Sequence, residues 1–481
     1  MSELKNKTIK GIFWSGAFSI INQGLALFFS IIIARLLSPS DYGMTAMLTI
    51  FTTIATVLQE SGYVMVLTNK EEVTHKEYCT VFWFNVIISF IVYLILFHFA
   101  PFIATFYNRP ELLPLSRYVF LGFFISSFGI VQNAYLFKHI KVKEKGIINI
   151  TSLTVSGIVG IIMAIKGFSF WGLATQGLLN TLISTIAVWF YSPFRPSLQF
   201  DGIFLKSTIS DGIRFAIPNI FSVISNNIYS VILGKLYTPT NLGIYSQGNK
   251  FNVFGYSFIL GILRNVTQPV LVQVKSNSVQ FLVVFRKLYR FTLYISFPVM
   301  IGMSFISFEL ISFLLTDKWL DSAFIMKILS VSGFFIIIST LNTYALTSLN
   351  KTRIYMWLGI INSIINLVVA TIASLGGIIS LAFATVLSNL FILIMTFIII
   401  NRICHYQLKN ILYDTIPVLL IGLLSIFITH FITINIEEVF IRLIAKLLFT
   451  LILYITFSSL LKINTFYEIK EIIRKKFHFK I

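Results

Sequence analysis

The chain has 481 residues, of which 57% are hydrophobic and 11% are charged, and its mean hydropathy is +0.87. A soluble domain of ordinary composition has about 25% charged residues, so this composition excludes a soluble enzyme, a secreted binding module and a disordered scaffold. The apolar segments are continuous runs rather than alternating strands. They predict an all-α integral membrane protein instead of a β-barrel.

In chain order, apolar runs of spanning length predict about fourteen transmembrane helices. They are expected at residues 11–36, 42–66, 79–106, 113–137, 147–165, 168–191, 209–236, 242–272, 289–315, 322–348, 354–374, 378–400, 413–433 and 439–461. The longest polar stretch between spans, 192–208, is too short for a soluble domain. The last segment, 462–481, is basic and amphipathic, which favours a location on the anionic inner surface of the membrane.

The net charge of +19 comes from 37 Lys and Arg against 18 Asp and Glu. Basic residues collect in the cytoplasmic loops of membrane proteins, so topology accounts for most of this excess, and we expect no nucleic-acid partner. If the N-terminus is inside, most of the Lys and Arg face the cytoplasm. The charge pattern therefore predicts a multi-pass membrane protein with both termini in the cytoplasm.

Two segments 200 residues apart have similar sequences. Residues 34–43 (ARLLSPSDYG) and 234–243 (GKLYTPTNLG) share the pattern small, basic, Leu, any, Ser/Thr, Pro, Ser/Thr, Asp/Asn, any, Gly. Each predicts a tight turn, because Pro ends one helix, the short polar side chains cap the next, and Gly permits close approach. The repeat predicts two parallel six-helix lobes followed by two more helices. The expected divisions are 1–200 and 201–408 for the lobes, 409–461 for the two helices and 462–481 for a cytoplasmic tail.

Four segments carry a resemblance to a known family: residues 34–43, 80–84 (TVFWF), 100–117 (APFIATFYNRPELLPLSR) and 234–247 (GKLYTPTNLGIYSQ). Through them the chain resembles the Wzx-type polysaccharide transporters of the MOP flippase superfamily, which have a MATE-like fold. The resemblance implies that the chain moves undecaprenyl-diphosphate-linked repeat units across the cytoplasmic membrane for O-antigen, capsule or exopolysaccharide synthesis. It implies alternating access coupled to H⁺ or Na⁺, no enzymatic activity and no cofactor, with other polysaccharide assembly proteins as partners.

Five basic residues in or beside spans are candidate ligands for the implied diphosphate, because charges within the membrane are costly. Arg35 and Lys235 occupy matching positions in the two turns. Lys250 and Arg264 lie fourteen residues apart on one expected span and therefore share roughly one helix face. Arg214 opens another span. Structural alternatives stay open, namely contacts with lipid head groups or the turns for Arg35 and Lys235, and a surface ion pair for Arg214.

Two acidic residues are candidates for ion coupling. Glu60 lies near the inner end of the second expected span and Glu309 lies in the ninth. Each is expected either to bind the coupling ion or to pair with a basic residue of its lobe. Cys79 and Cys404 stand alone in the sequence, and the six His residues are scattered, so we expect no metal site.

Two other classes of function remain as alternatives. One is a small-molecule or multidrug exporter of the same fold, or a lipid II flippase, since the superfamily contains both. The other is a membrane polysaccharide polymerase or ligase, which the short outer loops disfavour because a catalytic acid or base must reach its substrate.

Overall fold

In the computed structural model of the chain, residues 2–60, 67, 70, 72–404 and 406–478 are described. The side chains of residues 2–13, 15, 17, 60, 208–218, 222, 226, 472, 473 and 475–478 lie outside this description. The described residues form helices joined by short turns, with no strand among them. Eleven of these helical segments are long and apolar enough to cross a membrane, which confirms the all-α membrane class. The count of about fourteen spans stays a prediction.

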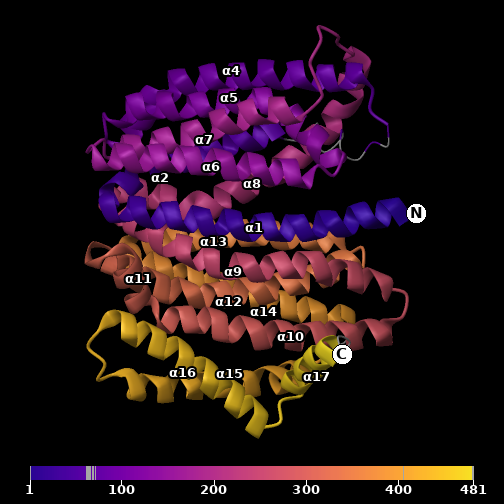
Figure 1. Ribbon diagram of the computed structural model, residues 1–481, viewed down its shortest axis with the longest axis vertical. Helices are drawn as coiled ribbons and strands as arrows, with labels where there is room; N and C mark the ends of the chain where they lie inside the picture. Colours follow the sequence, from indigo (N-terminus) through magenta and orange to yellow (C-terminus); the bar gives the residue numbers. More distant parts are fainter. Residues whose placement is uncertain (1, 61–66, 68–69, 71, 405, 479–481) are drawn as a thin grey trace. The chain divides into compact units, whose positions relative to one another are not determined.

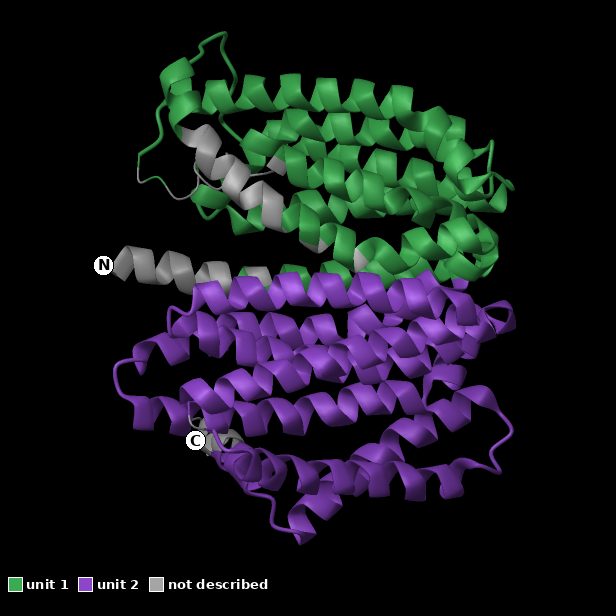
Figure 2. Cartoon of the chain, turned by 180° about the vertical axis from the view of Figure 1, so that it is seen from behind, with its two compact units in different colours: residues 1–243 green, residues 244–481 purple. Residues whose placement is uncertain are grey.

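The chain divides into two compact units, residues 1–243 and 244–481, coloured separately in Figure 2. Unit 1 contains α1 (Ser2–Leu36), α2 (Pro39–Glu60), α4 (His75–Tyr107), α5 (Leu112–Lys138), α6 (Val142–Ile165), α7 (Phe170–Tyr191) and α8 (Gly202–Leu236). Within it α6 packs against α1 and α7, and α5 packs against α4 and α7 (Figure 1). Helix α2 contacts α5, α7 and α8, so it lies among several helices of this unit.

Unit 2 begins within α9 and contains the remaining helices. They are α9 (Pro239–Gln273), α10 (Ser278–Phe305), α11 (Ser307–Leu315), α12 (Leu320–Ser348), α13 (Thr352–Ala373), α14 (Gly377–Cys404), α15 (Leu408–Thr433), α16 (Val439–Leu460) and α17 (Asn464–His478). Helix α12 packs against α10 and α14, while α15 and α16 pair with each other and contact α10. The span expected at 289–315 is divided between α10 and α11, because Ile306 leaves helical backbone angles (φ −94°, ψ 4°).

Large apolar side chains are exposed along the outer faces of these helices. Examples are Ile95 and Phe102 on α4, Ile186 and Phe190 on α7, and Ile452 on α16. In water such a surface would be unfavourable, but in a bilayer these side chains contact lipid tails. Many polar side chains are instead buried inside the units, and several of them, such as Gln59 and Asn342, bond to groups on other helices.

The two repeat turns have the same construction. Helix α1 ends at Leu36 and α2 begins at Pro39, and α8 ends at Leu236 while α9 begins at Pro239. In the first turn Ser38 donates hydrogen bonds from its backbone nitrogen and its hydroxyl to the Asp41 carboxylate, at 2.8 and 2.7 Å. In the second the Asn241 N–H donates to Thr238 Oγ1 at 3.3 Å. The predicted polar caps are present in both turns. The prolines, expected to end the preceding helix, instead begin the following one, where a missing N–H costs no helical hydrogen bond.

Candidate functional site

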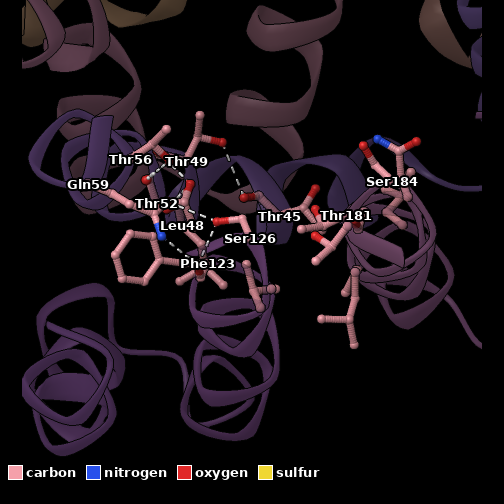
Figure 3. Close-up of a pocket in the computed structure, with 18 of the residues that line it drawn as sticks. Thr45, Leu48, Thr49, Thr52, Thr56, Gln59, Phe123, Ser126, Thr181 and Ser184 are labelled. Carbon is pink, nitrogen blue, oxygen red and sulfur yellow. Dashed lines mark hydrogen bonds between the residues drawn. The ribbon is translucent and has the colours of Figure 1, made fainter. Parts of the chain in front are cut away.

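Unit 1 contains a cavity of about 550 Å³ between α2, α5 and α7, shown in Figure 3. This volume lies within the range of about 300–1,000 Å³ that small-molecule sites occupy. Its lining residues are Thr45, Leu48, Thr49, Thr52, Thr56, Gln59, Val119, Gly122, Phe123, Ser126, Ile130, Asn133, Leu173, Ala174, Gly177, Leu178, Asn180, Thr181, Ser184 and Thr185. Below it is called the unit 1 cavity.

Helix α2 contributes a row of threonines to the unit 1 cavity. Thr45, Thr49, Thr52 and Thr56 are spaced by four, three and four residues, which places them on one face of the helix. Thr52 Oγ1 donates to the carbonyl of Thr49 at 2.9 Å, and Thr56 Oγ1 to that of Thr52 at 2.8 Å. These bonds within the helix hold the hydroxyl oxygens in position along the cavity wall.

Gln59 ends this row and joins three helices. Its side chain is only 2% exposed. The Nε2 atom donates to Ser89 Oγ on α4 at 2.8 Å and to the Phe123 carbonyl on α5 at 3.2 Å. The Ser126 hydroxyl on α5 donates to Gln59 Oε1 at 2.9 Å, as the dashed lines at Gln59 in Figure 3 indicate. This amide therefore links α2 to α4 and α5 through buried hydrogen bonds.

Replacing Gln59 by leucine is expected to destabilise the protein by about 1–3 kcal/mol, because buried hydrogen-bond partners lose their bonds. Thr53→Val is the matched control, since the Thr53 hydroxyl also bonds within α2, at 2.7 Å to the Thr49 carbonyl, but does not line the cavity. Thermal unfolding of the purified variants in detergent measures the difference. Equal midpoints for Gln59→Leu and Thr53→Val would contradict the role of Gln59.

Helices α5 and α7 form the other walls of the unit 1 cavity. Asn133 Nδ2 donates to the Gly129 carbonyl at 3.2 Å, and Thr181 Oγ1 donates to the Gly177 carbonyl at 3.1 Å. Gly177 leaves room within this wall, because a Cβ atom added there would meet no atom within 4 Å. The walls therefore combine small residues with neutral polar groups.

Of the basic residues singled out in the sequence, the four whose side chains are described are not among the residues that line the unit 1 cavity. Arg35 and Lys235 are exposed near the ends of α1 and α8. Lys235 Nζ donates to the Phe106 carbonyl at 2.5 Å and lies 4.8 Å from the centre of the Phe106 ring. It therefore caps the C-terminal end of α4, where unpaired carbonyls attract a cation. Lys250 and Arg264 are exposed on the part of α9 that belongs to unit 2.

Of the two acidic candidates for ion coupling, only Glu309 has a described side chain. Glu309 on α11 and Lys446 on α16 are each 8% exposed, and Lys446 Nζ lies 2.6 Å from Glu309 Oε1. Lys446 Nζ also lies 4.4 Å from the centre of the Phe305 ring. Glu309 thus pairs with Lys446, which lies in the predicted additional helices (409–461) and not in the lobe 201–408 where a partner was expected. The side chains of Glu60 and Arg214 lie outside the described residues.

The unit 1 cavity does not follow from the positions of the charged residues, because its described lining carries neutral polar side chains. A signal for it is present in the sequence, since Thr45, Thr49, Thr52, Thr56 and Gln59 repeat every three or four residues in an otherwise apolar span. Such a polar stripe indicates a helix face turned away from lipid. Only the tertiary structure brings it together with the polar residues of α5 and α7.

Comparison with known proteins adds a family and a fold. A family model described as "Polysaccharide biosynthesis protein" matches residues 32–324. The lipopolysaccharide biosynthesis protein WzxC of Escherichia coli (strain K12) is 22% identical over 336 residues, which is 69% of this chain and 68% of that protein.

Two solved structures show the fold. The lipid II flippase MurJ in an inward closed conformation has a TM-score of 0.76 and 16% identity, covering 93% of this chain and 98% of that one. An inward-facing multidrug resistance MATE family transporter of the MOP superfamily has a TM-score of 0.63 and 14% identity, covering 80% and 94%. The chain therefore has the fold that these two membrane proteins share.

Proposed function

The chain belongs to the polysaccharide biosynthesis protein family, and from this premise we propose that it is a flippase for lipid-linked oligosaccharides. Its cargo would be an undecaprenyl-diphosphate-linked repeat unit, moved across the cytoplasmic membrane for a surface polysaccharide. The relatives support this, since WzxC is named for lipopolysaccharide biosynthesis and MurJ for flipping lipid II. In this proposal the chain is a transporter and not an enzyme.

The observation that carries the proposal is the unit 1 cavity. Eleven of its twenty lining residues are neutral and polar, although the helices around them expose apolar side chains to lipid. A polar recess among membrane-spanning helices has no use in a purely structural bundle, because polar groups in the membrane are costly. It suits a transporter whose cargo has a polar head group.

We further propose that the basic residues receive the diphosphate while two lobes alternate access. Arg35, Lys235, Lys250, Arg264 and Arg214 are the proposed ligands, since arginine and lysine bind phosphate oxygens through charge-assisted hydrogen bonds. In this proposal residues 1–200 and 201–408 are the moving lobes, residues 409–461 add two helices, and 462–481 lie on the cytoplasmic surface. Both termini are placed in the cytoplasm by the charge distribution.

Coupling to a proton or sodium gradient is part of the same proposal. Glu60 and Glu309 are the acidic residues assigned to it, and Glu309 would act through its pair with Lys446. Other proteins of polysaccharide assembly are proposed as partners, because the translocated repeat units need a polymerase on the far side of the membrane.

Deletion of the gene tests the function directly. We expect loss of the surface polymer together with retention of diphosphate-linked units on the inner leaflet, because only translocation is missing. Complementation with Arg264→Ala or Arg35→Ala is expected to lower polymer export about tenfold, the equivalent of one lost charge-assisted hydrogen bond. Lys351→Ala, an exposed cation between α12 and α13, is the control. An unchanged polymer and lipid pool after deletion would contradict the proposal.

A further inference from the structure

The described part of the lining of the unit 1 cavity is uncharged. Among the described residues that form it there is no Asp, Glu, Lys, Arg or His, and the polar groups are hydroxyls and amides. An anionic group entering this cavity would lose its water without gaining a cation, which is strongly unfavourable. The cavity is therefore unsuited to a diphosphate or a carboxylate.

Most of the threonine hydroxyls in the lining have already used their single hydrogen. Five of the six donate to a carbonyl of their own helix. These bonds are Thr45 to Tyr42 at 3.0 Å, Thr49 to Thr45 at 3.5 Å, Thr52 to Thr49 at 2.9 Å, Thr56 to Thr52 at 2.8 Å and Thr181 to Gly177 at 3.1 Å. A hydroxyl has one donor and two acceptor lone pairs, so these side chains offer the cavity acceptors.

The amides of Gln59 and Asn133 and the hydroxyl of Ser126 also donate hydrogen bonds to protein atoms. Asn133 Nδ2 donates to the Gly129 carbonyl and Gln59 Nε2 to Ser89 and Phe123. The single hydrogen of the Ser126 hydroxyl can go to Gln59 Oε1 or to the Phe123 carbonyl at 2.6 Å, so both of its acceptors are protein atoms. The described lining therefore offers mostly acceptors, with amide donors added by Asn133 and Asn180, so a ligand that satisfies it must bring several donors of its own. Sugar hydroxyls do so, whereas phosphate and carboxylate oxygens are acceptors only.

We propose that the unit 1 cavity binds an uncharged sugar residue of the cargo through the sugar's hydroxyl donors and excludes anionic groups. This rests on the proposed flippase function and assigns a chemical class to its candidate site. It also assigns sugar binding and diphosphate binding to different places, because the diphosphate must then bind outside this cavity. A charged sugar, such as a uronic acid, is excluded from the cavity for the same reason.

Gly177 allows the cavity to be filled without disturbing its walls. A side chain added there would meet no atom within 4 Å, so Gly177→Met projects into open space. Gly359→Met on α13 is the matched control, because Gly359 is also a mid-helix glycine with nothing within 4 Å and lies outside the cavity. Thr52→Val and Thr181→Val remove acceptors at nearly constant volume, with Thr53→Val as their control.

The test is saturation-transfer NMR on the full chain in lipid nanodiscs. The probes are a panel of neutral oligosaccharides that includes cellotriose, together with trigalacturonate and inorganic pyrophosphate. We expect neutral probes to bind the wild type, Gly359→Met and Thr53→Val. Binding is expected to be lost in Gly177→Met and weakened about tenfold in the double variant Thr52→Val/Thr181→Val, which loses two neutral hydrogen bonds. Trigalacturonate and pyrophosphate are expected not to displace the neutral probes.

Three results would overturn the inference. They are no binding of any neutral probe to the wild type, equal binding in Gly177→Met and Gly359→Met, and displacement of cellotriose by trigalacturonate or pyrophosphate. A flipping assay in liposomes separates this inference from the proposed function. If the wild type and Gly177→Met flip the lipid-linked oligosaccharide equally, the cavity assignment fails and the function stands. If the wild type binds neutral sugars but moves no lipid, the function fails and the cavity assignment stands.

Discussion

Replacing Gly43 or Gly243 by valine is expected to reduce polymer export at least tenfold, although the variant is present in the membrane at the wild-type level. A Cβ atom added to Gly43 would overlap the backbone carbonyl of Pro239, and one added to Gly243 would overlap that of Pro39. The contact is thus reciprocal, with each turn's glycine against the other turn's proline. Backbone atoms cannot rotate away as a side chain does, so the two turns must separate when either glycine gains a side chain.

The size of the effect follows from the cost of overpacking. Forcing extra carbon atoms into a packed contact costs about 1–3 kcal/mol, which lowers the population of the conformation with both turns in contact about tenfold or more. Both turns lie in unit 1, so this contact holds the ends of α1, α2 and α8 together, and we expect export to fall with the fraction of molecules that keep it. The two glycines belong to the same contact, so Gly43→Val/Gly243→Val is expected to cost less than the sum of the single variants.

The measurement is surface polymer in a deletion strain complemented with each variant, with membrane levels checked by immunoblot. Gly261→Val is the control, since Gly261 on α9 has nothing within 4 Å of an added Cβ atom. Wild-type export by Gly43→Val would show that the contact between the turns is dispensable.

Replacing Lys446 by methionine is expected to destabilise unit 2 by about 3–5 kcal/mol, because Glu309 is then left charged and buried. The pair joins α11 to α16, with Lys446 Nζ 2.6 Å from Glu309 Oε1. Glu309 Oε2 is buried without a hydrogen-bond partner, so the lysine is the main compensation for this carboxylate among the described residues. Glu309→Gln/Lys446→Met removes both charges and is expected to recover most of the lost stability.

Thermal unfolding of the purified single and double variants measures these differences in stability as a double-mutant cycle. Lys287→Met is the control, since the bond between Lys287 and Glu468, at 3.1 Å, is a more exposed ion pair of the same unit. An unfolding midpoint for Lys446→Met equal to that of Lys287→Met would contradict the prediction.

The double variant also tests the proposed coupling role of Glu309. If it flips lipid-linked oligosaccharide with an unchanged dependence on the proton or sodium gradient, Glu309 is a structural partner of Lys446 and does not carry the coupling ion. If the protein is stable but its gradient dependence is gone, the coupling assignment is supported.

A second ion pair attaches the C-terminal helices to α10. Arg286 donates to both carboxylate oxygens of Asp414 on α15, at 2.6 and 2.9 Å, and the Tyr406 hydroxyl donates to Asp414 Oδ2 at 2.8 Å. With Glu309 and Lys446, this gives two charged links between the α15–α16 pair and the rest of unit 2. Neither pairing is visible in the sequence, because the partners lie more than 120 residues apart.

The sequence by itself determined the class of the protein, the approximate positions of its helices and the form of its two repeat turns. These properties are local, because a chain in lipid must satisfy its own backbone hydrogen bonds. Long apolar runs therefore form helices wherever they occur in the chain. The turn at Ser38 and Asp41 closes through bonds between residues three apart, and the same pattern at Thr238 and Asn241 predicts the second turn.

Only the tertiary structure decided which helix faces meet. The rotation of each helix about its axis depends on packing against its neighbours and not on its own composition. For this reason the stripe ending at Gln59 became one wall of a cavity, Glu309 found Lys446, and Gly43 came to face Pro239. The basic residues were predicted as ligands from their charge alone. The cavity consists of neutral groups, which form a site only because three helices bring them together.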